Sequence, residues 1–191
     1  MDGIKAEKLS KSYGDKKVIN EMSFFIPYGS CVQICGASGK GKTTLLRLIA
    51  GIEDPDSGTI SGADKGEISF LFQDDRLLPF KTVLENVSIV IKEKSRKNAA
   101  REILEELGLG KELDAYPHEL SGGMRRRVAI ARALVYDRNI LILDEALRGL
   151  DEGNLLRTAE VIEKHSEGKT VIFVTHGEPI TARSFERIEV I

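Results

Sequence analysis

The stretch Gly36-Ala37-Ser38-Gly39-Lys40-Gly41-Lys42-Thr43-Thr44 determines how the rest of this chain is interpreted. It fits the pattern Gly-x-x-x-x-Gly-Lys-Ser/Thr, whose small residues let backbone N–H groups approach phosphate oxygens. A β-prone apolar run, 31–35, precedes it, and residues 43–50 carry apolar side chains at helical spacing until Gly51. A strand, a glycine loop and a helix N-terminus in this order predict a phosphate-binding loop, because the helix end supplies partial positive charge. The alternative, a glycine turn beside a chance lysine, does not account for the flanking elements.

The whole loop, 36–44, is predicted to bind a nucleoside triphosphate. Lys42 is expected to reach the β- and γ-phosphates, and the hydroxyl of Thr43 is expected to bind Mg²⁺.

The composition of the 191 residues, 41% hydrophobic and 30% charged, predicts a soluble globular protein of one domain. The net charge of −2 gives no global basic field, so we expect no nucleic-acid partner. No apolar run approaches the roughly 18 residues that would span a bilayer, and no signal segment is recognised at the N-terminus. The only cysteines, Cys31 and Cys35, are expected to be buried thiols, which favours a reducing cytoplasm.

Polar side chains follow three apolar runs at the points where strands are expected to end. Gln73 follows 68–72, Asp144 and Glu145 follow 140–143, and His176 follows 171–175. The carboxyl ends of parallel strands are where α/β folds place their ligand chemistry. We therefore expect these side chains to surround the phosphates of the bound nucleotide.

Each of these side chains has a predicted role. Asp144 and Glu145 are adjacent in a strand and point to opposite faces, so they are expected to act separately. Asp144 is predicted to hold Mg²⁺ through water, and Glu145 to orient and deprotonate an attacking water. The carbonyl oxygen of Gln73 could reach the metal and its water, or the side chain could cap the strand. His176 is expected to contact the γ-phosphate, with a structural role as the alternative.

The N-terminal region has a β pattern. The predicted elements are strands at 4–9 and 18–26, a turn at 12–15, and another turn at 55–58. Tyr13 stands beside a glycine turn, where its ring could stack on an adenine with Val18 packed nearby. An incidental surface tyrosine is the equal alternative.

Residues 76–136 have a helical pattern, with helices predicted at 82–91 and 96–107 and from Leu120 onward. Ser121, Gly122 and Gly123 open this last helix and predict a second anion-binding helix N-terminus, with an ordinary N-cap as the alternative. Met124, Val128, Ala131 and Val135 form its apolar stripe, and Arg125, Arg126 and Arg127 lie at its start. A further helix is predicted at 151–167.

Together these features resemble the ATP-binding cassette (ABC) ATPases over nearly the whole chain. The motifs that carry the resemblance are the loop 36–44, Gln73, the Leu120–Met124 signature, the strand 140–145, the turn Gly149-Leu150-Asp151 and His176. The resemblance implies an α/β fold, a P-loop NTPase with a RecA-like core, an N-terminal antiparallel β piece and an inserted helical subdomain. It divides the single domain 1–191 into a core, 1–75 and 137–191, and a helical subdomain, 76–136. It also implies ATP and Mg²⁺ as cofactors.

The resemblance further implies a head-to-tail dimer. Ser121, Gly122 and Gly123 of one subunit would clamp the γ-phosphate held by the other, and two ATP molecules would be enclosed. The dimer could be formed by two copies of this chain or with a different cassette.

A finer resemblance concerns 73–80, 82–87 and Met124, which are similar to the ATPases of nitrate-, sulfonate- and taurine-type importers. It implies transmembrane permease subunits whose coupling helix docks after Gln73, and a solute-binding protein that acts indirectly. The expected location is cytoplasmic, peripheral on the cytoplasmic face of the cell membrane. Arg148 and Gly149 depart from the Ser-Ala that is common in the family before Leu-Asp, which puts the dimer contacts there in doubt.

Three other functions were weighed against an importer ATPase. An exporter ATPase is possible within the transport class, and only the segment 73–87 argues against it. A soluble ABC ATPase of DNA repair or translation would usually carry a long coiled-coil insert or a second cassette. A P-loop kinase would need a lid over its acceptor substrate and would lack the Leu-Ser-Gly-Gly signature.

Overall fold

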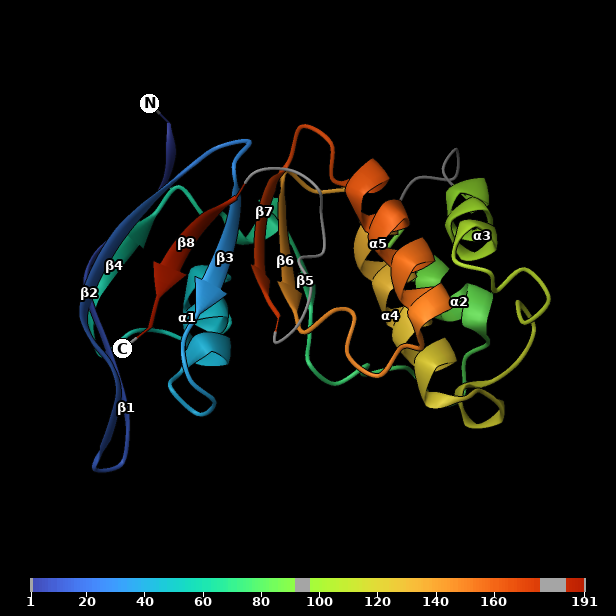
Figure 1. The fold of residues 1–191 in the computed structure, drawn as a ribbon, viewed down its shortest axis with the longest axis horizontal. Helices are drawn as coiled ribbons and strands as arrows, with labels where there is room; N and C mark the ends of the chain where they lie inside the picture. The colour runs from blue at the N-terminus through green and yellow to red at the C-terminus, as the bar shows by residue number, and fades with distance from the viewer. Residues whose placement is uncertain (1, 92–96, 176–184, 191) are drawn as a thin grey trace.

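The computed structural model describes residues 2–91, 97–175 and 185–190 (Figure 1). A five-stranded parallel sheet lies at its centre, in the strand order β5-β6-β7-β3-β8. Its strands are β3 (Cys31–Cys35), β5 (Ile68–Leu71), β6 (Ile140–Asp144), β7 (Thr170–Val174) and β8 (Glu186–Glu189). Within the described ranges, no helix has the length and apolar character required to cross a membrane.

Both faces of this sheet are covered, which explains why its central strands are continuous apolar runs. Side chains alternate between the faces with a period of two. Along β6, Ile140 and Ile142 belong to one buried cluster and Leu141 and Leu143 to the other. The first cluster contains helix α1 (Lys42–Ile49), and the second contains the helices on the opposite side.

A three-stranded antiparallel sheet, in the order β2-β1-β4, packs on the cluster that contains α1 (Figure 1). Its strands are β1 (Gly3–Tyr13), β2 (Lys16–Pro27) and β4 (Ser57–Ser61). The predicted fold class, a parallel core with an N-terminal antiparallel β piece, is confirmed.

Two strands were not predicted. β4 begins at Ser57, inside the turn expected at 55–58, and β8 lies in a stretch with no apolar pattern. Gly58 marks a close backbone approach rather than a turn: its φ is 87°, and a Cβ there would lie 2.4 Å from the carbonyl oxygen of Lys8. Both strands lie at sheet edges and pair through backbone hydrogen bonds, which leave no signal in the side chains.

The remaining helices lie on one side of the parallel sheet (Figure 1). They are α2 (Val83–Ser88), α3 (Lys97–Glu106), α4 (Gly122–Val135) and α5 (Glu152–His165). The 3₁₀ turns lie elsewhere along the chain, at Lys65–Glu67 before β5 and at Pro117–Glu119 before α4. Helix α2 is shorter than the predicted 82–91, because Thr82 and Glu85 form a capping box at its start and Ile89 already caps its end.

Helices α2, α3 and α4 share one apolar cluster with the sheet, including Leu143 and Phe173. The helical part is therefore packed on the same core as the strands, and the division at residues 76 and 136 stays a prediction.

The buried amide of Asn86 fixes the segment before α2. It is fully buried, donates to the carbonyl oxygens of Leu78, Lys81 and Thr82 at 2.9–3.1 Å, and accepts from the Leu78 N–H at 2.7 Å. We expect Asn86→Ala to lower the free energy of unfolding by about 2 to 4 kcal/mol, because several buried backbone groups lose their partners. Urea denaturation measures this. Ser88→Ala, which removes one bond to the Leu84 carbonyl, should change it by less than about 0.5 kcal/mol, and an equal loss in both variants would contradict the argument.

Candidate active site

A pocket of about 370 Å³ opens at the carboxyl ends of the parallel strands. It gathers residues from the tip of the antiparallel sheet, the glycine loop and the ends of β5, β6 and β7. The lining residues are Tyr13, Lys16, Val18, Ser38, Gly39, Gly41, Lys42, Thr43, Thr44, Gln73, Glu145 and Val174. Ten of them are among the residues that the sequence predicted for the site, while Lys16 and Val174 were not predicted.

Two glycines of the loop are required by close approach. Gly41 has φ 99°, and a Cβ there would lie 2.4 Å from Cγ1 of Val18. Gly36 has φ 143°, and a Cβ there would lie 2.5 Å from the carbonyl oxygen of Val190. The loop can therefore wind tightly between β2 and the end of β8, which leaves its N–H groups to face a phosphate.

Lys42, the first residue of α1, is buried, with 8% of its surface exposed. Its ammonium group donates to the carbonyl oxygens of Gly36 at 2.8 Å and Ala37 at 3.0 Å. These bonds hold the charge across the mouth of the loop. A phosphate bound in the loop would find a cation already positioned beside it.

Thr43 and Asp144 form a pair suited to a magnesium ion. The Thr43 hydroxyl donates to Oδ2 of Asp144 at 2.8 Å, and Oδ1 of Asp144 is a buried oxygen without a hydrogen-bond partner among the described residues. Burial raises the pKa of the Asp144 carboxyl, against the bond from Thr43, which lowers it. A single carboxylate and a hydroxyl fit Mg²⁺, which takes its other ligands from nucleotide phosphates and water.

Glu145 stands at the pocket, immediately after β6, in a left-handed conformation with φ 52°. Its backbone N–H donates to the carbonyl oxygen of Val174 at 3.0 Å. Its Oε2 accepts from Nη1 of Arg148 at 2.8 Å and lies 3.4 Å from Nε2 of Gln73. The side chains of Gln73 and Glu145 therefore meet in the pocket, and the unusual backbone of Glu145 is of the kind found at functional sites.

Tyr13 lies at the rim of the pocket with 47% of its surface exposed. Its hydroxyl donates to Glu53, which also pairs with Arg47 of α1 at 3.1 Å. Burial, and then the bond to Glu53, raise the pKa of the Tyr13 phenol. The hydroxyl contact fixes the ring at the pocket edge, where a nucleotide base could lie against it.

The structure does not bring every predicted site residue to this pocket. Ser121, Gly122 and Gly123 do not line it, and Ser121 caps α4 by accepting the N–H of Met124 at 3.2 Å. Gly36, Ala37 and Lys40 belong to the loop but do not line the pocket, and neither does Asp144, which bonds to the lining residue Thr43. His176 lies outside the described residues.

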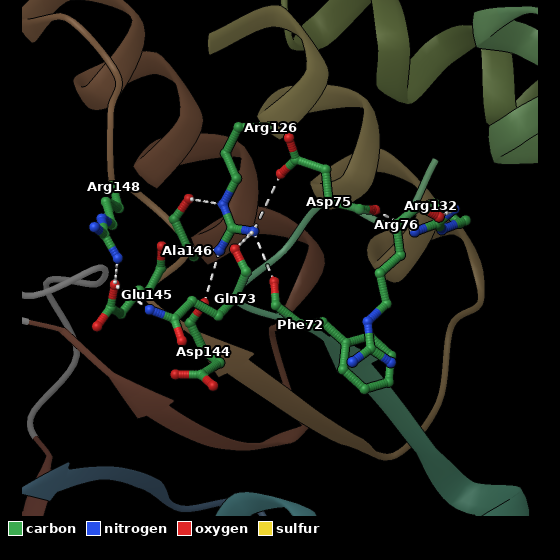
Figure 2. Close-up of polar contacts among 10 residues, drawn as sticks. All are labelled: Phe72, Gln73, Asp75, Arg76, Arg126, Arg132, Asp144, Glu145, Ala146 and Arg148. Carbon is green, nitrogen blue, oxygen red and sulfur yellow. Dashed lines mark hydrogen bonds and ion pairs between the residues drawn. The ribbon is translucent and has the colours of Figure 1, made fainter. Parts of the chain in front are cut away.

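A further residue that the sequence did not predict for the site is Arg126 of α4. It was expected only to lie at the start of the helix, but 5% of its surface is exposed and its guanidinium bonds to the backbone next to Gln73 and Glu145 (Figure 2). A signal was present: Arg126 is four residues before Ile130 and seven before Ala133, both buried, so the helical period places it on an inward face.

Comparisons with known proteins agree with this geometry. A profile of the ABC transporter family matches residues 19–148. The chain is 43% identical to the aliphatic sulfonates import ATP-binding protein SsuB 2 of Agrobacterium fabrum, over 88% of the chain and 68% of the relative. It is 40% identical to SsuB of Burkholderia ambifaria, over 92% of the chain and 56% of the relative.

Solved structures are similar as well. A dimer of the ATP-binding cassette MJ0796 in a post-hydrolysis state, bound to ADP and phosphate, superposes with a TM-score of 0.83. It shares 30% identity and covers 91% of this chain and 88% of the other. Another dimer of MJ0796, described as a bacterial ABC transporter cassette, has a TM-score of 0.84 at 28% identity, over 98% and 96% of the two chains.

This chain belongs to the ABC transporter family. It is an ATP-binding cassette that hydrolyses ATP, and the resemblance to sulfonate-type importer ATPases is confirmed.

We expect Lys42→Ala to weaken ATP binding by at least about 100-fold, because a buried ammonium at the phosphates is lost. Titration with a fluorescent ATP analogue measures this affinity. Lys17→Ala, on the exposed surface of β2, is the matched control and should bind as the wild type does. Unchanged affinity in Lys42→Ala would remove this lysine from the site.

Proposed function

We propose that this chain is the ATP-hydrolysing subunit that energises a membrane importer, with ATP and Mg²⁺ bound in the pocket described above. The observation that carries the proposal is the convergence of the phosphate loop, the Thr43–Asp144 pair and Glu145 on one pocket. The same elements would bind a nucleotide, neutralise its charge and place a base beside its γ-phosphate.

Each residue then has a defined part in hydrolysis. The loop N–H groups and Lys42 bind the β- and γ-phosphates and stabilise the charge that develops during transfer. Thr43 and Asp144 would hold Mg²⁺, which would neutralise charge on the phosphates. Glu145 accepts a proton from the attacking water. Gln73 contacts the metal or the water, and His176 contacts the γ-phosphate.

We propose that the working unit is a head-to-tail dimer. Ser121 and Gly122 are exposed at the N-terminus of α4 and do not line the pocket of their own chain, which leaves them available to a nucleotide on a partner. The dimeric state of the similar cassettes supports the same arrangement. The partner is a second copy of this chain or a different cassette.

The segment after Gln73 is the proposed docking site for a transmembrane permease. Phe80 is 91% exposed and Leu78 is 39% exposed, so two apolar side chains face outward here while Asn86 holds the backbone from behind. The relatives' names support an importer of aliphatic sulfonates. A solute-binding protein is proposed as an indirect partner. The cassette would act on the cytoplasmic face of the cell membrane.

The role of Glu145 is tested by Glu145→Gln. This variant should bind ATP with wild-type affinity but turn over at least about 100-fold more slowly, because the amide cannot accept the proton. Phosphate release and nucleotide titration measure the two properties. With ATP and Mg²⁺ the variant should also accumulate as a dimer in light scattering. Wild-type turnover would remove Glu145 from its role, and a monomer at saturating ATP would rule out a dimer of two copies of this chain and leave a different cassette as the partner.

The docking proposal is tested by capturing the tagged chain from detergent-solubilised native membranes. A multi-spanning membrane protein should co-purify in stoichiometric amount with the wild type and fall by about 10-fold with Phe80→Ala, since an exposed aromatic anchor is lost. The matched control is Leu156→Ala, which truncates another exposed apolar side chain, on α5. If the wild type captured only soluble or nucleic-acid-associated proteins, the transporter role would be wrong.

A further inference from the structure

The guanidinium of Arg126 joins two segments of the active site that are far apart in the sequence (Figure 2). On one side it meets the turn after β6: Nε donates to the carbonyl oxygen of Ala146 at 3.0 Å, and Nη2 donates to those of Asp144 at 2.7 Å and Glu145 at 2.8 Å. On the other side it meets the segment after β5: Nη1 donates to the carbonyl oxygens of Phe72 at 2.7 Å and Gln73 at 3.1 Å.

Only a planar group with several N–H donors can make these contacts at once. Arginine has five N–H donors in a fixed fork, and here they meet five carbonyl oxygens together with Oδ1 of Asp75 at 3.3 Å. An ammonium has three donors around a single nitrogen and cannot span both segments. The relative position of the two segments is thus set by the geometry of one side chain.

The contacts also explain how Glu145 keeps its unusual backbone. A non-glycine residue with positive φ is strained and persists only when its surroundings hold it. The carbonyl groups on both sides of Glu145 and its own carbonyl all accept from Arg126. Loss of these bonds would let the turn relax and would move the carboxylate away from the pocket.

From these contacts we infer that Arg126 is a positioning residue for ATP hydrolysis, whose guanidinium holds Glu145 against Gln73 and makes the two segments move together. The inference rests on the proposed roles of Glu145 and Gln73. The inference also goes beyond those roles, because the Arg126 guanidinium pairs with Asp75. Asp75 belongs to the segment that leads from Gln73 to Phe80, the proposed docking site.

A second arginine of the same helix extends this connection. Arg132 donates to the carbonyl oxygens of Asp75 at 2.7 Å and Arg76 at 3.0 Å, and the Arg76 guanidinium lies 3.8 Å from the centre of the Phe72 ring. Residues 72–76 are therefore fastened to α4 at two points. A partner that displaces residues 77–80 pulls on this segment, and Arg126 passes the displacement to Glu145.

The test compares Arg126→Gln and Arg126→Lys with Arg127→Gln in the full chain. Arg127 is the matched control: it is the next residue of α4, 7% exposed, and its Nη1 donates to the Leu107 carbonyl at 2.8 Å, away from the pocket. All three variants lose a buried guanidinium, so all should unfold at lower temperature. Both Arg126 variants should lose about 10- to 100-fold in kcat with KM for ATP within about threefold, because the base is misplaced while the phosphate loop is intact. Arg127→Gln should keep kcat within about threefold.

Amide hydrogen exchange gives a readout that does not depend on turnover. Exchange should rise together in 72–76 and 144–148 in the Arg126 variants and in neither segment in Arg127→Gln. Arg126→Lys keeps the buried positive charge and most of the side-chain volume. Hydrogen exchange and kcat can therefore be measured in this variant even if Arg126→Gln does not fold. Equal kcat in the Arg126 and Arg127 variants, or faster exchange in only one of the two segments, would overturn the inference. Failure of the proposed function is seen separately, as wild-type turnover in Glu145→Gln.

Discussion

The parallel pairing of β5, β6, β7 and β3 is the constraint on which the site depends. Leu71 pairs with Leu143 and Asp144 with Val174, so these strands end at one level. Neighbouring strands lie only about 4.8 Å apart, and the segments that leave them must therefore converge. The glycine loop leaves β3 at this edge and Glu145 leaves β6 at the same edge. The strand register thus brings together the backbone segments that carry the proposed phosphate, metal and base residues.

Burial of charge at this edge is the second constraint, because each buried ion must find partners inside the protein. Lys42 is satisfied by two loop carbonyl groups and Arg126 by five carbonyl groups and Asp75. Asp144 is different, because one of its oxygens accepts from Thr43 and the other has no hydrogen-bond partner within the part of the chain that the structure describes. The cations are thus compensated by the protein itself. The carboxylate keeps an oxygen for a ligand, which is the property expected of a metal-binding residue.

How much of this could be predicted depended on whether the signal was local. The phosphate loop, Gln73, Asp144 and Glu145 could be predicted because each follows an apolar run, and Gln73 and Glu145 both line the pocket. The strand β4 could not be predicted, because an edge strand is stabilised by backbone hydrogen bonds to its neighbour rather than by a pattern of side chains. Arg126 was missed for a related reason. Its acceptors are main-chain carbonyl groups some 18 to 54 residues away. Since every residue has such a carbonyl group, the sequence does not indicate which ones Arg126 contacts.

Helix α4 connects the proposed dimer contact at Ser121 with the turn that carries Glu145. Its N-cap, Ser121, is proposed to face the nucleotide of a partner subunit, and Arg126 holds the catalytic turn of its own chain. A helix rises about 1.5 Å per residue, so these two points lie roughly 8 Å apart along one rigid element. A phosphate bound at the N-terminus of α4 would therefore contact the same helix whose Arg126 positions Glu145. In the proposed dimer, closure of one nucleotide site would therefore be linked to the position of Glu145 in the other through α4 itself.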